Sequence, residues 1–354
     1  MKDPLLATAG QFCPGQAIAE IKTLGNGLIN DTFLVSAAES KFVLQRINGR
    51  VFSQPERVIE NLQCIGRHLQ SLDARMIKLT LPALLQTAAG DYGYRDPAGD
   101  FWRALALIEH GQSRECLSRR SEAGQTGFAL AHFHRLFSNL EPGLLHDTLP
   151  GFHVTPGYLR HYDQVAAASA ADRKDESVVF CRRFIDDYRD KCDVLENARR
   201  QGLLRERIIH GDPKLNNFLF AGDADSIISL IDLDTVKPGL VHYDIGDCLR
   251  SCCHIKRDHR FDLDLCASVL ENYLREAGSF FSDADYDYLY AAIELIPFEL
   301  GLRFFTDFLN GDRYFKVKRR DQNLERAVEQ FRLCQDVRRQ RPHIDALIDR
   351  LRNV

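Results

Sequence analysis

Short apolar runs dominate the first third of the chain, and longer patterns with helical spacing dominate the rest. The early runs are rich in β-branched and aromatic residues and are separated by turn residues, so they predict an antiparallel meander. Between them, apolar positions recur every three to four residues over 55–72 with Pro55 near the start, which predicts one helix. The expected strands cover residues 18–23, 32–35, 42–44, 81–87 and 102–108.

After residue 111 the pattern becomes mainly helical, with one exception. Residues 207–210 and 226–234 are two short β-rich runs on either side of a polar segment. The whole pattern predicts an α+β protein of two lobes. We expect a small β-rich N-terminal lobe over 1–106, a hinge at 107–111 and a larger, mostly helical lobe over 112–354.

Composition narrows the possible partners. The 354 residues contain 46 Lys+Arg and 50 Asp+Glu, a net charge of −4, with 45% hydrophobic and 27% charged residues. These values are typical of a globular protein and provide no basic field for nucleic acid. No apolar run is long enough to cross a bilayer, and the first residues lack the pattern of a secretory signal. We therefore expect a cytoplasmic protein, a monomer or weak dimer, that binds neither nucleic acid nor membrane.

The ten cysteines predict reduced thiols rather than a metal centre. No two of them form a C-x-x-C pair. Cys248, Cys252, Cys253 and His254 lie close enough in sequence to be considered as a soft-metal site. However, Cys248 and Cys252 are one helical turn apart, and small buried thiols in a core helix account for that spacing. We expect the latter.

The strongest candidate for chemistry lies between the two β-rich runs of the second half. The segment 208–220 reads IIHGDPKLNNFLF, and 227–234 reads IISLIDLD. A tight polar loop is thus anchored by apolar flanks and carries a carboxylate, an ammonium and two amides. Phosphoryl transfer needs this set of groups: a base for the acceptor hydroxyl, oxygen ligands for Mg²⁺ and a cation for the phosphoryl group.

The spacing agrees with the catalytic loop of protein kinases, H-R-D-x-x-x-x-N followed by a metal-binding Asp on a later strand. It assigns Asp212 as base, Lys214 as the neutralising cation, and Asn217 and Asp232 as magnesium ligands. Asp234 is ambiguous, since one of the two aspartates can hold the metal while the other binds the loop. The pair of motifs resembles the aminoglycoside phosphotransferase and choline kinase superfamily, which implies a kinase-like fold, ATP as co-substrate and a small-molecule acceptor. In that superfamily His210 organises the loop.

The N-terminal lobe supports this resemblance with one departure. The segment 25–35 reads GNGLINDTFLV and lies where a phosphate-covering loop belongs; its candidate nucleotide-binding residues are Gly25, Gly27, Asn30 and Thr32. The strand position that carries a lysine in kinases is Gln45 here. Arg46 is predicted on the opposite face of that strand, and Lys41 is the other nearby cation. The adenine base is expected at the hinge, against the backbone of Leu107 and Glu109.

Longer stretches are similar to one branch, the N-acetylhexosamine 1-kinases. They include FVLQRIN at 42–48, where that branch also has Gln for Lys, and GLRFFTDFLNGDRYF at 301–315. This resemblance implies phosphorylation of the anomeric hydroxyl of GlcNAc or GalNAc, with Arg303 and Tyr314 in the sugar pocket. The plain alternative is an Arg303 that pairs with an acid such as Asp307. Asp244 and Arg250 are expected to hold the catalytic loop.

Two other interpretations stay open from the sequence. The acceptor could be choline, homoserine or an aminoglycoside, as for other members of the superfamily. A choline site would require an aromatic cage and an aminoglycoside site an acidic groove, and neither can be recognised along the chain. Because Gln45 replaces the usual lysine, the chain could also be a pseudokinase that binds nucleotide without turnover.

Overall fold

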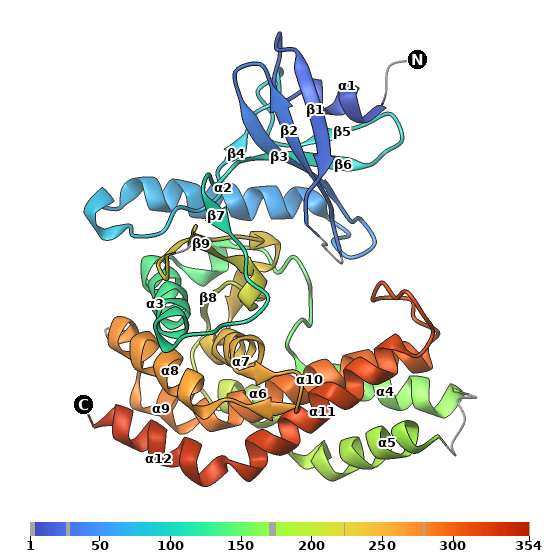
Figure 1. Cartoon of the computed structure of the whole chain (residues 1–354), viewed down its shortest axis with the longest axis vertical. Helices are drawn as coiled ribbons and strands as arrows, with labels where there is room; N and C mark the ends of the chain where they lie inside the picture. The colour runs from blue at the N-terminus through green and yellow to red at the C-terminus, as the bar shows by residue number, and fades with distance from the viewer. Residues whose placement is uncertain (1–3, 26–28, 170–174, 223, 279, 354) are drawn as a thin grey trace.

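The computed structural model describes residues 4–25, 29–169, 175–222, 224–278 and 280–353. An antiparallel sheet forms the N-terminal part, with strands in the spatial order β1, β2, β3, β6 and β4, and with β5 paired to β6 (Figure 1). A short helix that the pattern did not predict, α1 (Pro4–Gly10), lies beside β1. The strands are β1 (Ile18–Thr23), β2 (Asp31–Ala37), β3 (Lys41–Ile47), β4 (Leu84–Leu85), β5 (Tyr94–Arg95) and β6 (Phe101–Ala106).

The alternating patterns located the main strands of this sheet, but one prediction was too long. Instead of a strand over 81–87, only Leu84 and Leu85 pair with β6. Pro82 has no N–H to donate to a ladder, which accounts for the late start of this strand. In the observed register Gln45 of β3 is opposite Thr32 of β2 on one side and Arg103 of β6 on the other.

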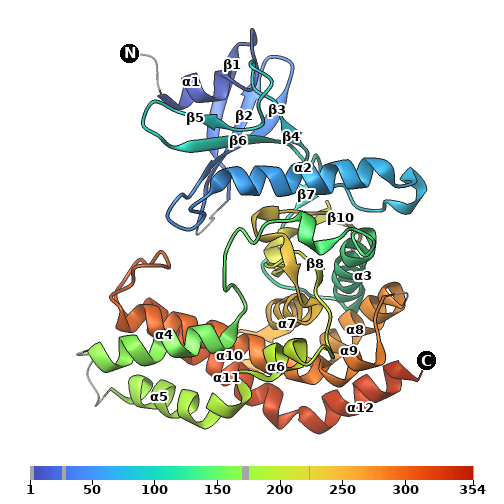
Figure 2. The same ribbon diagram turned by 180° about the vertical axis from the view of Figure 1, so that it is seen from behind.

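Helix α2 (Pro55–Ser71) lies between the sheet and the helical part of the molecule, as Figures 1 and 2 show from opposite sides. Its buried residues Val58, Leu62 and Ile65 belong to the larger hydrophobic core rather than to the separate small core of the sheet. Asn61 Nδ2 also donates to the carbonyl of Val236 at 2.9 Å. This hydrogen bond connects helix α2 to the segment that follows Asp234.

The C-terminal part is built from helices around that larger core. Helix α3 packs on α8, while α10 packs on α7, α11 and α4. The helices are α3 (Arg120–Leu136), α4 (Thr155–Ala168), α5 (Glu176–Tyr188), α6 (Val194–Arg200), α7 (Val241–Cys252), α8 (Leu263–Ala277), α9 (Asp283–Asp287), α10 (Leu289–Leu309), α11 (Gln322–Arg339) and α12 (Arg341–Arg352).

Short strands within this helical part frame the polar segments singled out above. Strand β9 pairs with β10 and with β7, which begins at Gly111; β8 pairs with β11. The loop 210–217 therefore runs from β8 to β9, and the loop 231–236 runs from β10 to β11. The strands are β7 (Gly111–Gln112), β8 (Arg207–Ile209), β9 (Phe218–Ala221), β10 (Ile227–Leu230), β11 (Lys237–Gly239), β12 (His254–Ile255) and β13 (Arg260–Phe261).

This architecture confirms the predicted α+β fold, with an antiparallel sheet followed by a helical part. Strand β6 ends at Ala106 and β7 begins at Gly111, so the predicted hinge lies between a strand of the N-terminal sheet and a strand of the helical part. None of the helices in the described ranges is long and apolar enough to cross a membrane.

Candidate active site

The loop 210–217 is held in place from its first residue. His210 is fully buried, and its Nδ1 accepts a hydrogen bond from the N–H of Asp212 at 3.3 Å. Its Nε2 must then carry the proton, and it donates to the carbonyl of Ile231 at 2.9 Å. Burial is the main cause that lowers the pKa of His210, in keeping with a neutral ring. These contacts support the predicted role of His210 as an organiser of the loop.

Asp244, at the first turn of α7, holds the backbone of the same loop. Its carboxylate accepts hydrogen bonds from the N–H groups of His210 (2.7 Å) and Gly211 (2.9 Å), and His134 Nε2 lies 2.9 Å from it. The predicted contact between Asp244 and the loop is thus present. Arg250 does not share it, because its guanidinium pairs with Asp247 at 2.8 Å.

A second buried group that sequence reasoning missed holds the loop from the other side. His153 Nε2 donates to the carbonyl of Gly211 at 2.8 Å, and His153 Nδ1 donates to Glu299 at 2.9 Å. Both ring nitrogens are donors, so His153 is an imidazolium. Burial acts to lower its pKa, but the Glu299 carboxylate outweighs burial and the pKa is raised. A lone histidine in a loop and a glutamate within an apolar helix carry no motif, so the pattern gave no signal for this pair.

Asp212, Lys214 and Asn217 come together at the end of this supported loop. Lys214 Nζ contacts the Asp212 carboxylate directly. Asn217 Nδ2 donates to the backbone carbonyl of Asp212 at 2.7 Å, which leaves the amide oxygen available as a ligand. Burial opposes the charge of Lys214, but Asp212 and Asp232 outweigh it and raise the lysine pKa, so the ammonium stays charged.

Asp232 follows β10 in an unusual backbone conformation. Its φ of 65° and ψ of 57° lie in the left-handed region, which costs of order 1–3 kcal/mol for a residue other than glycine. Desolvation by the surrounding protein, reinforced by the charges of Asp234 and Asp212 and opposed by Lys214, raises its pKa to about 6. Within the described residues no donor hydrogen-bonds its carboxylate. The residue is solvent-exposed, so a cation can reach its carboxylate, and an oxygen acceptor near the charges of Lys214 and Asp212 fits a hard divalent cation such as Mg²⁺.

Asp234 has different surroundings, which the sequence did not reveal. Its carboxylate forms a buried ion pair with Arg103 of β6 and accepts from Asn30 Nδ2 at 2.7 Å. Arg103 also donates to Gln45 Oε1 from Nε (3.0 Å) and Nη2 (2.7 Å). Gln45 therefore orients a cation from the neighbouring strand, at the position where kinases carry a lysine. The third guanidinium nitrogen, Nη1, is buried and has no partner in the part of the chain that the structure describes.

Three of the four candidate nucleotide-binding residues in the N-terminal loop, Gly25, Asn30 and Thr32, lie within the described residues. Gly27 lies outside the described residues, and Gly25 has a left-handed φ of 72°. The side chains of two others are used within the protein: Asn30 Oδ1 accepts from the N–H of Asn48 at 3.0 Å, and Thr32 Oγ1 accepts from Gln45 at 3.1 Å.

The two expected adenine-binding positions, Leu107 and Glu109, lie between β6 and β7. Leu107 is half-buried and Glu109 is exposed. Their part in nucleotide binding stays a prediction.

Arg46 and Lys41, the other cations considered near Gln45, are not at the site. Arg46 pairs with Asp31 and, at 2.7 Å, with Asp100. Lys41 is exposed at the start of β3. The strand geometry thus bears out the prediction that Arg46 points to the opposite face.

Arg303 of α10 lies among aromatic rings. Its guanidinium carbon is 4.9 to 5.9 Å from the ring centroids of Phe152, Tyr158, Tyr314 and Phe315. The alternative pairing with Asp307 is wrong. The Asp307 carboxylate instead accepts from three consecutive N–H groups of residues 313–315, each at 2.9 Å, and so shapes the loop that carries Tyr314.

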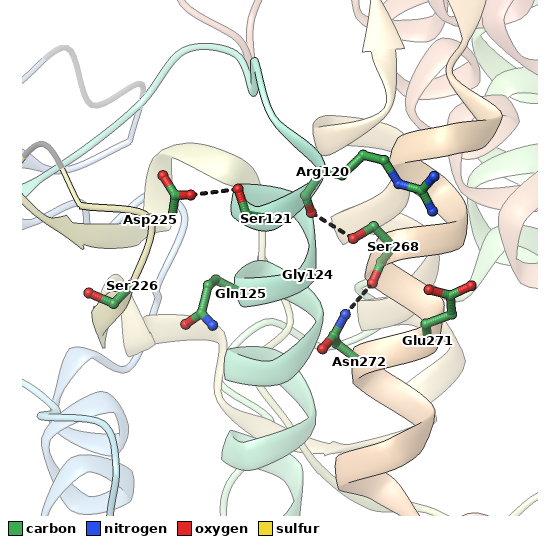
Figure 3. Close-up of a pocket in the computed structure, with 9 residues that line it drawn as sticks. All are labelled: Arg120, Ser121, Gly124, Gln125, Asp225, Ser226, Ser268, Glu271 and Asn272. Carbon is green, nitrogen blue, oxygen red and sulfur yellow. Dashed lines mark hydrogen bonds between the residues drawn. The ribbon is translucent and has the colours of Figure 1, made fainter.

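One surface depression in the described structure lies elsewhere. A volume of about 370 Å³ opens between α3, α8 and the end of β9–β10, as Figure 3 shows. Its polar groups bind one another: Ser121 to Asp225 at 2.5 Å, and Ser268 to the carbonyl of Arg120 at 2.6 Å. None of the catalytic-loop residues lines it, so we do not assign it to the active site.

Comparisons with known proteins agree with this geometry. The model of the phosphotransferase enzyme family (APH) matches residues 20–290. An aminoglycoside phosphotransferase from Alicyclobacillus acidocaldarius is similar in structure, with a TM-score of 0.63, 16% identity, and 95% of this chain and 92% of that chain covered. A microcompartment-associated aminopropanol kinase has a TM-score of 0.64, 15% identity and coverages of 97% and 99%. An amicoumacin kinase, solved in complex with AMP-PNP, Ca²⁺ and Ami, has a TM-score of 0.59, 13% identity and coverages of 95% and 92%.

Proposed function

This chain belongs to the phosphotransferase enzyme family, and on that premise we propose that it transfers the γ-phosphoryl group of Mg-ATP to the anomeric hydroxyl of an N-acetylhexosamine, GlcNAc or GalNAc. The observation that carries the kinase assignment is the meeting of Asp212, Lys214 and Asn217 beside Asp232. Within the fold, the amicoumacin kinase solved with AMP-PNP and Ca²⁺ supports a nucleotide and a divalent cation as ligands.

Each residue has a role that its surroundings support. Asp212 accepts the hydrogen bond of the acceptor hydroxyl and takes its proton as the new P–O bond forms and the bond to ADP breaks. Asn217 and Asp232 hold Mg²⁺, which, when bound, neutralises charge on the β- and γ-phosphates. Lys214, charged and in contact with Asp212, neutralises the transferring group. Asp234 serves as an anchor rather than a ligand, because Arg103 and Asn30 occupy its carboxylate.

Arg103 takes the place of the missing N-terminal lysine in this proposal. It is a buried cation held by Gln45 and Asp234, and its Nη1 has no partner among the described residues. A phosphate oxygen of ATP would satisfy this donor. The replacement of lysine by Gln45 therefore does not require a pseudokinase, since the cation comes from the next strand.

The surroundings of Arg303 favour a neutral acceptor over a cationic one. A choline site needs an open aromatic cage, but here four rings already surround the guanidinium of Arg303. A fixed positive charge beside the acceptor also disfavours polycationic aminoglycosides. The Arg303 pKa is raised, with burial opposed by Tyr158, Tyr314, Glu299 and Asp212 nearby, so the charge is permanent. A sugar with hydroxyl and amide oxygens suits such a donor.

The test is ATP consumption with a panel of acceptors: GlcNAc, GalNAc, GlcNAc 6-phosphate, choline, homoserine and kanamycin. We expect turnover of GlcNAc or GalNAc, with the sugar 1-phosphate identified by phosphorus NMR. Asp212→Asn should lower kcat by ~10²–10⁴, while Asp349→Asn, on the exposed face of α12, should leave it unchanged. Turnover of another acceptor with both sugars inert would overturn the substrate, and near-normal activity of Asp212→Asn would overturn the mechanism.

A further inference from the structure

Two histidines and a glutamate meet at the far end of α7. His254 begins β12 directly after that helix, His259 lies in the turn between β12 and β13, and Glu329 lies on α11. One ligand atom from each of the three lies within 4.8 Å of the others, and His254 Nδ1 is 3.6 Å from Glu329 Oε1. Residues from three separate elements are thus brought to one point.

The histidines at this point have unused buried nitrogens. The His254 side chain is only 4% exposed. Its Nε2 and the Nδ1 of His259 are both buried without a hydrogen-bond partner in the described structure. A buried polar atom left unpaired costs about 1–3 kcal/mol. The unpaired Nδ1 of His259 is therefore available for an additional partner at this cluster, whereas the unpaired Nε2 of His254 lies across the ring from the Nδ1 that faces Glu329.

The hairpin that carries the histidines is fixed independently of any ligand. The N–H of Phe261 donates to Asp336 of α11 at 2.8 Å, and Gln340 Nε2 donates to the carbonyl of Phe261 at 2.8 Å. His254 itself pairs with Phe261 across the hairpin. The three side chains are consequently presented on a scaffold that needs little rearrangement to bind.

The chemistry of the cluster selects the kind of ligand. A neutral imidazole offers the lone pair of one ring nitrogen to a metal ion, and the Glu329 carboxylate supplies the negative charge. Of the neighbouring cations, Arg250 is paired with Asp247. Two imidazoles and one carboxylate suit Zn²⁺ and similar transition metals, whereas Mg²⁺ prefers an all-oxygen shell.

We propose that His254, His259 and Glu329 form a Zn²⁺ site that clips the β12–β13 hairpin to α11. Zn²⁺ binds such ligands at about 2.0–2.2 Å in a tetrahedron. The 3.6 Å between His254 and Glu329 is close to the spacing that this geometry requires, and the ligand atoms of all three residues lie within 4.8 Å of one another. Glu329 is 29% exposed, which leaves a fourth position for water and a path for the ion.

The site lies away from the proposed catalysis. Asp244 holds the catalytic loop from the first turn of α7, and the helix ends at Cys252, about 12 Å further along at the helical rise, just before His254. The proposed role is therefore structural, and it does not depend on the proposed kinase activity. Its readouts are metal binding and thermal stability.

Zinc binding to the full chain without an affinity tag tests this proposal, in a Cys116→Ser background that removes the one exposed thiol. After chelator treatment and desalting, calorimetric titration with Zn²⁺ should give a stoichiometry of one ion per chain. Thermal denaturation should then show a higher Tm for the zinc-loaded protein than for the metal-free protein. Co²⁺ should give the visible absorption of a tetrahedral site. His259→Ala, in a partly exposed turn, and Glu329→Gln should each weaken binding at least tenfold, and His343→Ala, exposed on α12, should not.

Three outcomes would contradict the proposal. The first is that the parent protein binds no Zn²⁺ at a stoichiometry of one. The second is that His259→Ala and Glu329→Gln bind Zn²⁺ as tightly as the parent. The third is that equimolar Mg²⁺ displaces the ion, which would show a site without the predicted nitrogen ligands.

Discussion

Arg103 of β6 and Asp234 of the β10–β11 loop form an ion pair that joins the sheet to the helical part of the chain, with side-chain exposures of 1% and 2%. Asn30, just before β2, also binds Asp234. One carboxylate thus connects two segments of the N-terminal part to the segment that carries Asp232. We expect this connection to set the position of the nucleotide as well as the stability of the fold.

Replacing Arg103 should reveal both effects. Arg103→Met leaves a buried carboxylate without its cation, so we expect the free energy of unfolding to fall by about 3–5 kcal/mol, as measured by urea denaturation. The KM for ATP should rise at least tenfold, because the free Nη1 is lost. The double variant Arg103→Met/Asp234→Asn should be more stable than Arg103→Met, but its KM for ATP should remain as high.

A matched control is available on the neighbouring strand. Arg46 pairs with Asp31 and Asp100, but all three side chains are about 40% exposed. Arg46→Met should therefore lower the free energy of unfolding by no more than about 1 kcal/mol and leave the KM for ATP unchanged. A double Arg103/Asp234 variant with a normal KM would contradict the assignment of Arg103 to the nucleotide.

The effect of Mg²⁺ should depend on pH through Asp232. Desolvation by the surrounding protein and the neighbouring aspartates raise the pKa of Asp232 to about 6, above the ordinary value of 3.8. The native state therefore binds this proton more tightly than the unfolded state, and the resulting stability is lost as the pH rises through about 6. A cation binds only the deprotonated form. The increase in Tm produced by saturating MgCl₂, measured by scanning fluorimetry, should be larger at pH 7.5 than at pH 5.5.

Asp232→Asn should abolish this difference between the two pH values, whereas Asp349→Asn should preserve it. An equal Mg²⁺-induced shift at both pH values in the parent protein would show that Asp232 does not bind the cation.

The buried pair of His153 and Glu299 should also stabilise the protein in a restricted pH range. The His153 pKa is raised, because Glu299 outweighs burial, so its contribution is present below about 6.5 and disappears as the pH rises through its folded value. The Glu299 pKa is lowered despite burial, chiefly by His153, so its contribution is present above about 4.3 and disappears at lower pH. Glu299→Gln should lower the free energy of unfolding by about 3–5 kcal/mol between about pH 4.3 and about pH 6.5. At pH 8.5 the loss should be smaller.

Denaturation of the Glu299→Gln variant across this pH range is the measurement. The exposed pair of His146 and Glu60 is the control, and Glu60→Gln should cost no more than about 1 kcal/mol. A loss for Glu299→Gln that is the same at pH 6 and pH 8.5 would argue against a charged His153.

Gly211 should not tolerate a side chain. Its φ is +85°, and a Cβ there would lie 2.6 Å from the carbonyl oxygen of Thr235, which belongs to the loop carrying Asp232. Gly211→Ala should therefore displace Asp212 and lower kcat at least tenfold. Gly202 has a comparable φ of +71°, but an added Cβ would have no atom within 4 Å. Gly202→Ala should therefore lower the free energy of unfolding by about 1 kcal/mol and leave kcat unchanged. Equal kcat values for the two variants would contradict the steric argument.

Local patterns were sufficient to predict strands β1, β2, β3 and β6 of the sheet, helix α2 and the loop with Asp212, Lys214 and Asn217, but not β5. These features depend on spacing: alternation defines a strand, a period near 3.6 defines a helix, and the five-residue interval from Asp212 to Asn217 lies within one loop. Pro82 marks where this reasoning failed, because the apolar run around it was read without regard to its missing N–H.

The sequence by itself thus determined the fold class, the loop that carries Asp212, Lys214 and Asn217, and the phosphotransferase family. Only the tertiary structure decided that Arg103 pairs with Asp234, that His153 and Glu299 hold Gly211, and that His254, His259 and Glu329 converge. These partners lie 131, 146 and 75 residues apart in their widest pairs. Pairing over such distances is set by which elements pack together, and burial then gives each pair its strength. That is information that no local pattern contains.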